Sequence, residues 1–123
     1  MILPITIKSR NVLDRLHWSK KSMLKKEYAL LIRNQMKLNK HYSEPVKEPK
    51  FFTLEIVSYR KRLLDYDNLV GGVKQLLDAM IDEGYIWDDS PKYLDLRVKQ
   101  VKNSDPLRKK HKHLHNKTWV ARY

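Results

Sequence analysis

The segment from Phe51 to Tyr59 has the pattern that most restricts how this chain can fold. The apolar residues Phe52, Leu54 and Ile56 occupy every second position and so fall on one face. This period of two predicts a β-strand with one face toward the core. Any fold for the chain therefore has to place this strand in a sheet that is covered on that face.

The first half of the chain predicts one further strand and a long helix. Ile2 to Lys8 is predicted to be a short strand, at a sheet edge or a strand start because of Pro4, and Asn11 to Trp18 is predicted to be a loop. Ser19 resembles the N-cap of a helix that ends near Asn39. Met23, Leu24, Leu31 and Leu38 are among the apolar positions of that helix, and its other face carries Lys20, Lys21, Lys25, Lys26, Arg33 and Lys37. These cations fit either a solvated face or a DNA-facing one.

A second helix is predicted between the central strand and Gly84, which suits a helix C-terminus. Its apolar stripe consists of Val73, Leu76, Leu77, Met80 and Ile81. Gly71 and Gly72 would each cost about 1 kcal/mol inside a helix. Either the regular helix begins near Val73, or another part of the backbone approaches closely at the glycines.

The last third of the chain predicts two strands, Tyr93 to Val101 and Thr118 to Tyr123, separated by a basic loop from Lys102 to Asn116. The resulting order is β-α-β-α-β-β. It predicts one α+β domain over residues 1–123, with two main helices packed on a mixed β-sheet.

The amino-acid composition limits which class of binding partner and which cellular compartment fit this chain. The 26 Lys and Arg exceed the 14 Asp and Glu, which gives a net charge of +12 and favours a polyanion such as nucleic acid. A ribosomal or membrane-surface protein could have the same charge. The chain has no cysteine, so disulfides and thiolate metal sites are excluded. No apolar run approaches about 18 residues and no signal-peptide pattern is present, so a cytoplasmic protein is expected.

Acidic residues gather between residues 65 and 89 of this basic chain. Asp65 and Asp67 project to the same side if the backbone is extended, but lie about 200° apart in a helix. Shared metal binding therefore requires Asp67 to lie before the regular helix. Asp88 and Asp89 follow, and in an extended segment only one of them would reach the same ion. Carboxylate oxygens suit Mg²⁺, and Mg²⁺ can activate water for phosphodiester cleavage.

Lys74 and Asp78 lie four residues apart on one helix face. One interpretation is a surface ion pair that contributes roughly 0.3–0.5 kcal/mol. The other places Lys74 beside the metal site, where it contacts the scissile phosphate. The spacing alone leaves both open.

Three motifs in this region together resemble the RusA family of Holliday-junction resolvases. They are Asp65-Tyr-Asp67-Asn68-Leu, then Lys74-Gln-Leu-Leu-Asp78-Ala-Met, then Gly84-Tyr-Ile-Trp-Asp88-Asp89. The resemblance covers about 25 residues. It departs from the family pattern before Lys74, where about three additional residues intervene.

The resemblance implies a Mg²⁺-dependent homodimer that makes paired nicks in a four-way DNA junction, in a bacterium or a prophage. Asp65, Asp67 and Asp89 match the metal-binding aspartates, Asp88 is an ambiguous partner of Asp89, and Lys74 matches the catalytic lysine. Asn68 and Asp78 match positions expected to be structural. Whether Mn²⁺ substitutes for Mg²⁺ is left open. The alternatives are a non-catalytic basic nucleic-acid-binding protein, or a nuclease for other branched DNA such as flaps or forks.

Several basic residues outside the motifs are candidates for DNA contacts. They are Arg60, Lys61 and Arg62, just before Asp65, and Arg108, Lys109 and Lys110 in the basic loop. His111, His113 and His115 would share one face of a strand and could bind a transition metal. A basic DNA-contacting loop is the favoured interpretation of that segment.

Overall fold

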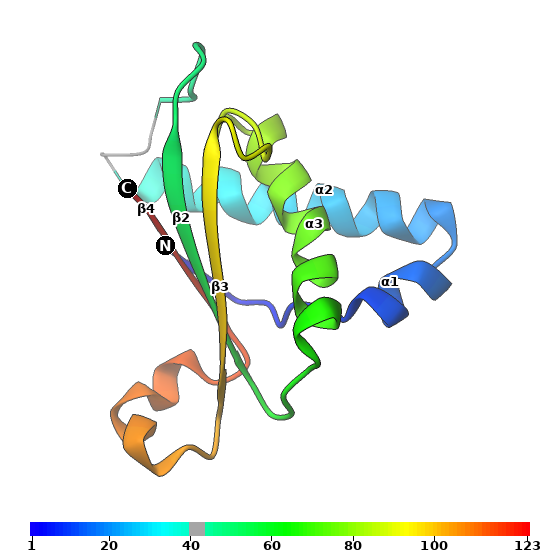
Figure 1. Cartoon of the computed structure of the whole chain (residues 1–123), viewed down its shortest axis with the longest axis vertical. Coiled ribbons are helices and arrows are strands. Elements are labelled where there is room, and N and C mark those ends of the chain that lie inside the picture. The colour runs from blue at the N-terminus through cyan, green and yellow to red at the C-terminus, as the bar shows by residue number, and fades with distance from the viewer. Residues whose placement is uncertain (40–43) are drawn as a thin grey trace.

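The protein is described by a computed structural model that covers residues 1–39 and 44–123, without the side chains of residues 107–109. Figure 1 shows how its helices and strands are arranged. In chain order the elements are β1 Ile2–Leu3, α1 Arg10–Arg15, α2 Trp18–Leu38, β2 Phe52–Arg60, α3 Tyr66–Asp82, β3 Leu94–Lys102, the 3₁₀ segment η2 Pro106–Leu114 and β4 Thr118–Arg122. Within the described ranges, no helix has the length and apolar character that a membrane span requires.

The strands form one mixed sheet in the order β1-β4-β2-β3. β2 and β3 are parallel and are connected through α3, with Phe52 opposite Leu94 and Arg60 opposite Lys102. β4 is antiparallel to both β2 and β1. The predicted α+β class with a mixed sheet is therefore confirmed.

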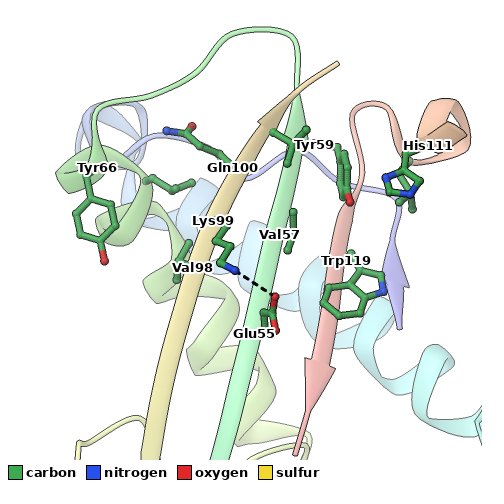
Figure 2. A pocket seen from close by; sticks show the side chains of 12 residues that line it. Glu55, Val57, Tyr59, Tyr66, Val98, Lys99, Gln100, His111 and Trp119 are labelled. Atoms are coloured by element: carbon green, nitrogen blue, oxygen red, sulfur yellow. Dashed lines mark ion pairs between the residues drawn. The ribbon is translucent and has the colours of Figure 1, made fainter. Parts of the chain in front are cut away.

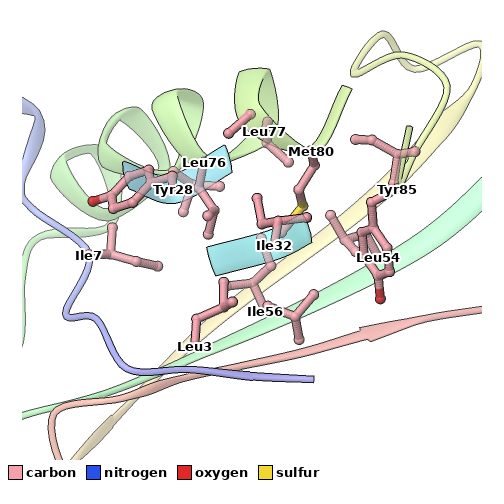
Figure 3. Close-up of a cluster of buried hydrophobic side chains, with 14 of the residues drawn as sticks. Leu3, Ile7, Tyr28, Ile32, Leu54, Ile56, Leu76, Leu77, Met80 and Tyr85 are labelled. Atoms are coloured by element: carbon pink, nitrogen blue, oxygen red, sulfur yellow. The ribbon is translucent and has the colours of Figure 1, made fainter. Parts of the chain in front are cut away.

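The main core lies between the sheet and helices α2 and α3, as Figure 3 shows. Leu54 and Ile56 of β2 are completely buried, which confirms the predicted inward face of this strand. They pack in one cluster with Ile32 of α2 and with Leu76 and Met80 of α3. The apolar stripe of α3 is buried as its helical period predicts, apart from Ile81, which is only partly buried.

Helix α2 was correctly predicted in extent, but not all of its apolar positions face the core. Met23 and Leu38 are 61% and 78% exposed. The buried residues are Leu24, Tyr28, Ile32 and Met36. They recur every four residues and make a single stripe against the sheet and α3. The N-cap is His17, not Ser19, and its ring accepts a hydrogen bond from the Ser19 amide.

The N-terminal segment differs from the prediction in two ways. The strand is limited to Ile2–Leu3, and the expected loop contains helix α1. Ser9 caps α1 by accepting a hydrogen bond from the Val12 amide at 3.2 Å. Leu13 is its buried residue, and α1 packs against α3, which supplies the apolar surface that a six-residue helix needs to be stable.

Helix α3 runs without interruption through Gly71 and Gly72, so the prediction that it begins near Val73 is wrong. The alternative, close backbone approach, is confirmed at Gly72. A Cβ placed there would lie 1.9 Å from the carbonyl oxygen of Lys8. At the other end, Gly84 has φ 75°, and the amides of Gly84 and Tyr85 bond to the carbonyls of Ile81 and Met80. This is the predicted glycine cap.

The opposite face of the sheet is only partly covered. A small second cluster there contains Val57 and Tyr59 of β2 with Leu114 of η2. Trp119 of β4 and Val101 of β3 pack against it. The segment η2 therefore shields one end of a sheet face that α2 and α3 do not reach.

Candidate functional site

The N-terminal end of α3 carries two carboxylates without partners. Asp65 is the N-cap residue and Asp67 lies in the first helical turn. Both are exposed, and neither side chain makes a hydrogen bond or an ion pair with the described residues. Because Asp67 is already helical, the expected extended geometry at this position is wrong. The two carboxylates are not held side by side by an extended backbone.

The middle of α3 carries a cluster of opposite charges. The Lys74 ammonium donates to the Asp89 carboxylate at 2.5 Å and lies 3.2 Å from the Asp78 carboxylate. The Lys74 side chain is 59% exposed, whereas that of Asp89 is 24% exposed. The hydrogen bond to Asp89, followed by the interactions with Asp78, raises the pKa of Lys74 above its usual value. Lys74 is therefore a protonated cation at neutral pH and not a general base.

Asp88 and Asp89 lie in the connection between α3 and β3. The buried side chains of Tyr85 and Ile86 anchor its start, and the Ser90 carbonyl accepts hydrogen bonds from the Tyr93 and Leu94 amides at its end. Asp89 is turned toward Lys74, while the Asp88 carboxylate is half-buried and unpaired among the described residues. The two neighbours thus differ in partners, and the expectation that only one of them joins the metal site stays a prediction.

Topology separates the candidate aspartates. Since β2 and β3 are parallel, α3 runs back along them (Figure 1). Asp65 therefore follows the end of β2, and Asp89 precedes the start of β3. Asp67 and Lys74 share one face of α3, about 10.5 Å apart along the axis. Among the described residues, no three His, Asp or Glu side chains are close enough together to hold a metal ion.

The residues present fit Mg²⁺ in their chemistry. Asp65, Asp67 and Asp89 offer hard carboxylate oxygens, and two of these side chains are exposed and unpaired. The third, Asp89, is bound to the Lys74 ammonium, a cation of this chain. A metal that used all three would have to draw them together and take the place of Lys74 at Asp89.

The basic residues before Asp65 separate into two kinds. Arg60 is 8% exposed and donates to the carbonyls of Ile7 at 2.8 Å and Arg62 at 2.7 Å. Burial also lowers the pKa of its guanidinium. These bonds hold the end of β2 to the N-terminal segment and argue against the predicted phosphate contact. Lys61 and Arg62 are exposed, so for them that contact stays a prediction.

The basic segment after β3 is helical and not extended. His111 and His113 belong to η2, so the condition for the transition-metal alternative, a strand with these side chains on one face, is not met. Their ring centroids lie 6.4 Å apart, and His111 meets the ring of Tyr59 edge-on at 6.1 Å. Lys110 is exposed. The side chains of Arg108 and Lys109 lie outside the described part of the chain.

Helix α1 brings residues to the site that the sequence did not suggest. The Asn68 side chain accepts a hydrogen bond from the Asn11 amide at 3.3 Å, which agrees with a structural role for Asn68. The Arg10 side chain lies over Gly71, between the levels of Asp67 and Lys74, and is 3.7 Å from Asp14. The Ser9 cap, followed by apolar Val12 and Leu13, was the available signal for this helix.

The half-open sheet face contains a hollow of about 630 Å³ (Figure 2). It crosses β4, β2 and β3 and reaches the N-terminal end of α3. Its lining includes the aromatic side chains Tyr59, Tyr66, His111 and Trp119, together with Glu55 and Lys99. Tyr66 connects the hollow to the candidate site, because it stands between Asp65 and Asp67 in the chain.

Comparisons of the chain with known protein families, with curated proteins and with solved structures find no match.

Proposed function

We propose that the protein is a Mg²⁺-dependent endodeoxyribonuclease that cuts branched DNA, with the four-way junction as its substrate. The proposal includes the resemblance to the RusA resolvases and the homodimer that this resemblance implies. It rests on the ordered motifs from Asp65 to Asp89 and on the net charge of +12.

One structural observation supports the proposal most directly. In a chain with 26 Lys and Arg, the carboxylates of Asp65, Asp67 and Asp88 have no cationic partner among the described residues. Carboxylates that no ion pair neutralises remain available as oxygen ligands for an added cation. By contrast, Asp82 and Glu83 at the other end of α3 are paired with Lys25 and Arg33.

In this proposal Asp65, Asp67 and Asp89 hold the metal and Lys74 assists. When bound, Mg²⁺ supplies an activated water and stabilises the leaving oxygen of the phosphodiester. Lys74 keeps its proton and donates a charge-assisted hydrogen bond to a phosphate oxygen once it is released from Asp89. Asp78 remains four residues away on α3 and keeps the ammonium on this face. Lys61 and Arg62 are the exposed cations nearest in sequence that can hold the DNA backbone.

The test uses labelled four-way junction, flap and duplex DNA with and without Mg²⁺. We expect Mg²⁺-dependent nicking of the junction, and a loss of at least about 100-fold for Asp67→Asn while junction binding is retained. Asp82→Asn is the matched control, because it removes a carboxylate at the other end of the same helix. Unchanged cleavage by Asp67→Asn would overturn the assignment of the metal site.

The second candidate is a non-catalytic basic nucleic-acid-binding protein. It is favoured by the location of Asp67 in the first turn of α3, where a negative charge stabilises a helix, and by the pairing of Asp78 and Asp89 with Lys74. In that case no DNA is cut under any condition, and Mg²⁺ only weakens binding by screening.

A further inference from the structure

The hollow on the half-open sheet face has a floor of side chains from neighbouring strands. Val57 of β2 and Trp119 of β4 are directly opposite in the antiparallel register, and Tyr59 lies two residues beyond Val57. Because Tyr59 is only 7% exposed, its side chain lies at the bottom of the hollow and not along its rim. The floor is therefore apolar and is fixed by the sheet.

Aromatic rings stand at both ends of this floor, as Figure 2 shows. His111 of η2 and Trp119 lie at one end, and Tyr66, which is 68% exposed, lies beyond β3 at the other. Aromatic rings at intervals along an open groove provide faces on which successive nucleobases stack.

Polar groups in the hollow can meet the edge of a base. Lys99 is 69% exposed and lies 3.8 Å from the Glu55 carboxylate, so a donor and an acceptor stand side by side over the floor (Figure 2). Nδ1 of His111 has no hydrogen-bond partner among the described residues, but it is buried, so it is not counted among the groups that a base can reach. Gln100 already bonds to both backbone groups of Leu64 and is not available either.

The charge around the hollow favours a polyanion. Lys99 projects from its middle, and the exposed side chains of Lys110 and Lys112 flank His111. Glu55, the one carboxylate among the described residues of the lining, is countered by Lys99. The positive surplus that a phosphate backbone would meet therefore comes from Lys110 and Lys112 on η2, next to the hollow.

We infer that this hollow binds a short unpaired segment of nucleic acid, with its bases stacked on Trp119 and Tyr66 and its phosphates along Lys99 and η2. The inference adds a substrate-binding surface to the proposed function. It rests on that function in one respect, that the partner is nucleic acid. Because Tyr66 lies between Asp65 and Asp67, a strand held in the hollow leads directly to the proposed metal-binding carboxylates. Duplex DNA cannot use the rings, since its bases are stacked on one another.

The test measures binding by fluorescence anisotropy in EDTA, so that cleavage plays no part. The probes are a labelled eight-nucleotide single strand and its duplex. Trp119→Leu keeps apolar volume on the floor but removes the ring, and Tyr66→Ala shortens an exposed side chain. The matched controls are Trp18→Leu and Tyr123→Ala, whose side chains are 75% and 70% exposed and do not line the hollow.

We expect each hollow variant to bind the single strand about tenfold more weakly and the duplex as before, since one stacked base contributes that much. Both controls should bind like the parent. Unchanged single-strand binding by Tyr66→Ala and Trp119→Leu would overturn the inference, as would an equal loss for single strand and duplex. Sedimentation tests a second explanation. If Trp119→Leu loses a dimer that the parent forms, while single-strand binding is unchanged, the inference is overturned. The face would then be an interface between two copies of the chain. None of these results depends on nuclease activity.

Discussion

The two ends of helix α3 are stabilised in opposite ways. At the C-terminal end, a glycine cap closes the helix, and Arg33 of α2 contacts Glu83 through two hydrogen bonds of 2.9 and 2.7 Å. At the N-terminal end, Asp65 makes no side-chain cap bond, and the helix is held instead by backbone contact at Gly72 and by α1. Acids at the C-terminal end are used to join two helices. Those at the N-terminal end are left unpaired, which is what a binding site requires.

The largest effect is expected from Gly72→Ala, which tests how the N-terminal end is held. A Cβ at this position meets the backbone oxygen of Lys8, which cannot move without displacing the N-terminal segment. We expect a loss of about 3 kcal/mol in the free energy of unfolding. Urea denaturation measures it.

Gly71→Ala is the matched control for this prediction. The three atoms nearest to a Cβ there all belong to the side chain of Arg10, which is largely exposed and can turn away. The better helix propensity of alanine offsets that movement, so the change should stay within about 1 kcal/mol. Equal losses for the two variants would contradict the assignment of Gly72 as the backbone contact point.

A smaller effect is expected from Gly84→Ala at the C-terminal end. The residue has φ 75°, and left-handed backbone costs a non-glycine residue about 1–2 kcal/mol. The new Cβ would also crowd Pro45. Thermal unfolding should show a lower Tm than the parent. A Tm equal to that of the parent would mean that the cap contributes nothing to this end of the helix.

Much of this molecule could be predicted from its sequence because the patterns were local. The alternating pattern of β2 and the apolar stripe of α3 depend only on residues that are close in sequence, and both were predicted correctly. Helix α2 was found, but its buried face was not, because Met23 and Leu38 are apolar and still face solvent. Which face is buried is decided by the sheet and by α3, and these are distant in sequence.

The sequence was enough to name the residues of the candidate site, but not to predict how they are arranged in space. Lys74 and Asp78 are four apart, so their pairing follows from helical spacing. The contact between Lys74 and Asp89 depends on the path of a connection 15 residues away along the chain, which no periodicity encodes. The helical position of Asp67 was missed because the glycine pair seemed to forbid a helix. The close approach of Lys8 that explains Gly72 is visible only in three dimensions.

Loss of the ion pair at the C-terminal end should have a modest effect that depends on salt. Glu83→Gln removes the charge that binds Arg33, and we expect a small decrease in Tm at low ionic strength. At 1 M salt, where the Debye length is about 3 Å, the difference should nearly vanish. A decrease that persisted undiminished at high salt would show that packing, and not charge, joins the two helices here.

The smallest effect on stability is expected from Asp67→Asn. Its carboxylate has no partner among the described residues, so only its interaction with the helix dipole is lost, about 0.5 kcal/mol. The difference in Tm between the parent protein and Asp67→Asn should increase when Mg²⁺ is added. The Tm of the parent protein should rise with the concentration of the ion, because binding to the folded state stabilises it. That of Asp67→Asn should rise much less. A large loss of stability without metal would instead make Asp67 a structural residue.

The segment η2 has a consequence for handling the protein. Its Leu114, 6% exposed, closes one end of the sheet face over Tyr59 and Val57. If residues 106–114 were replaced by a short turn, these side chains would form a continuous apolar surface with Trp119. Surfaces of that kind drive aggregation. The length of the connection between β3 and β4 therefore helps to determine the solubility of the chain, and a truncation aimed at its basic residues should leave Leu114 in place.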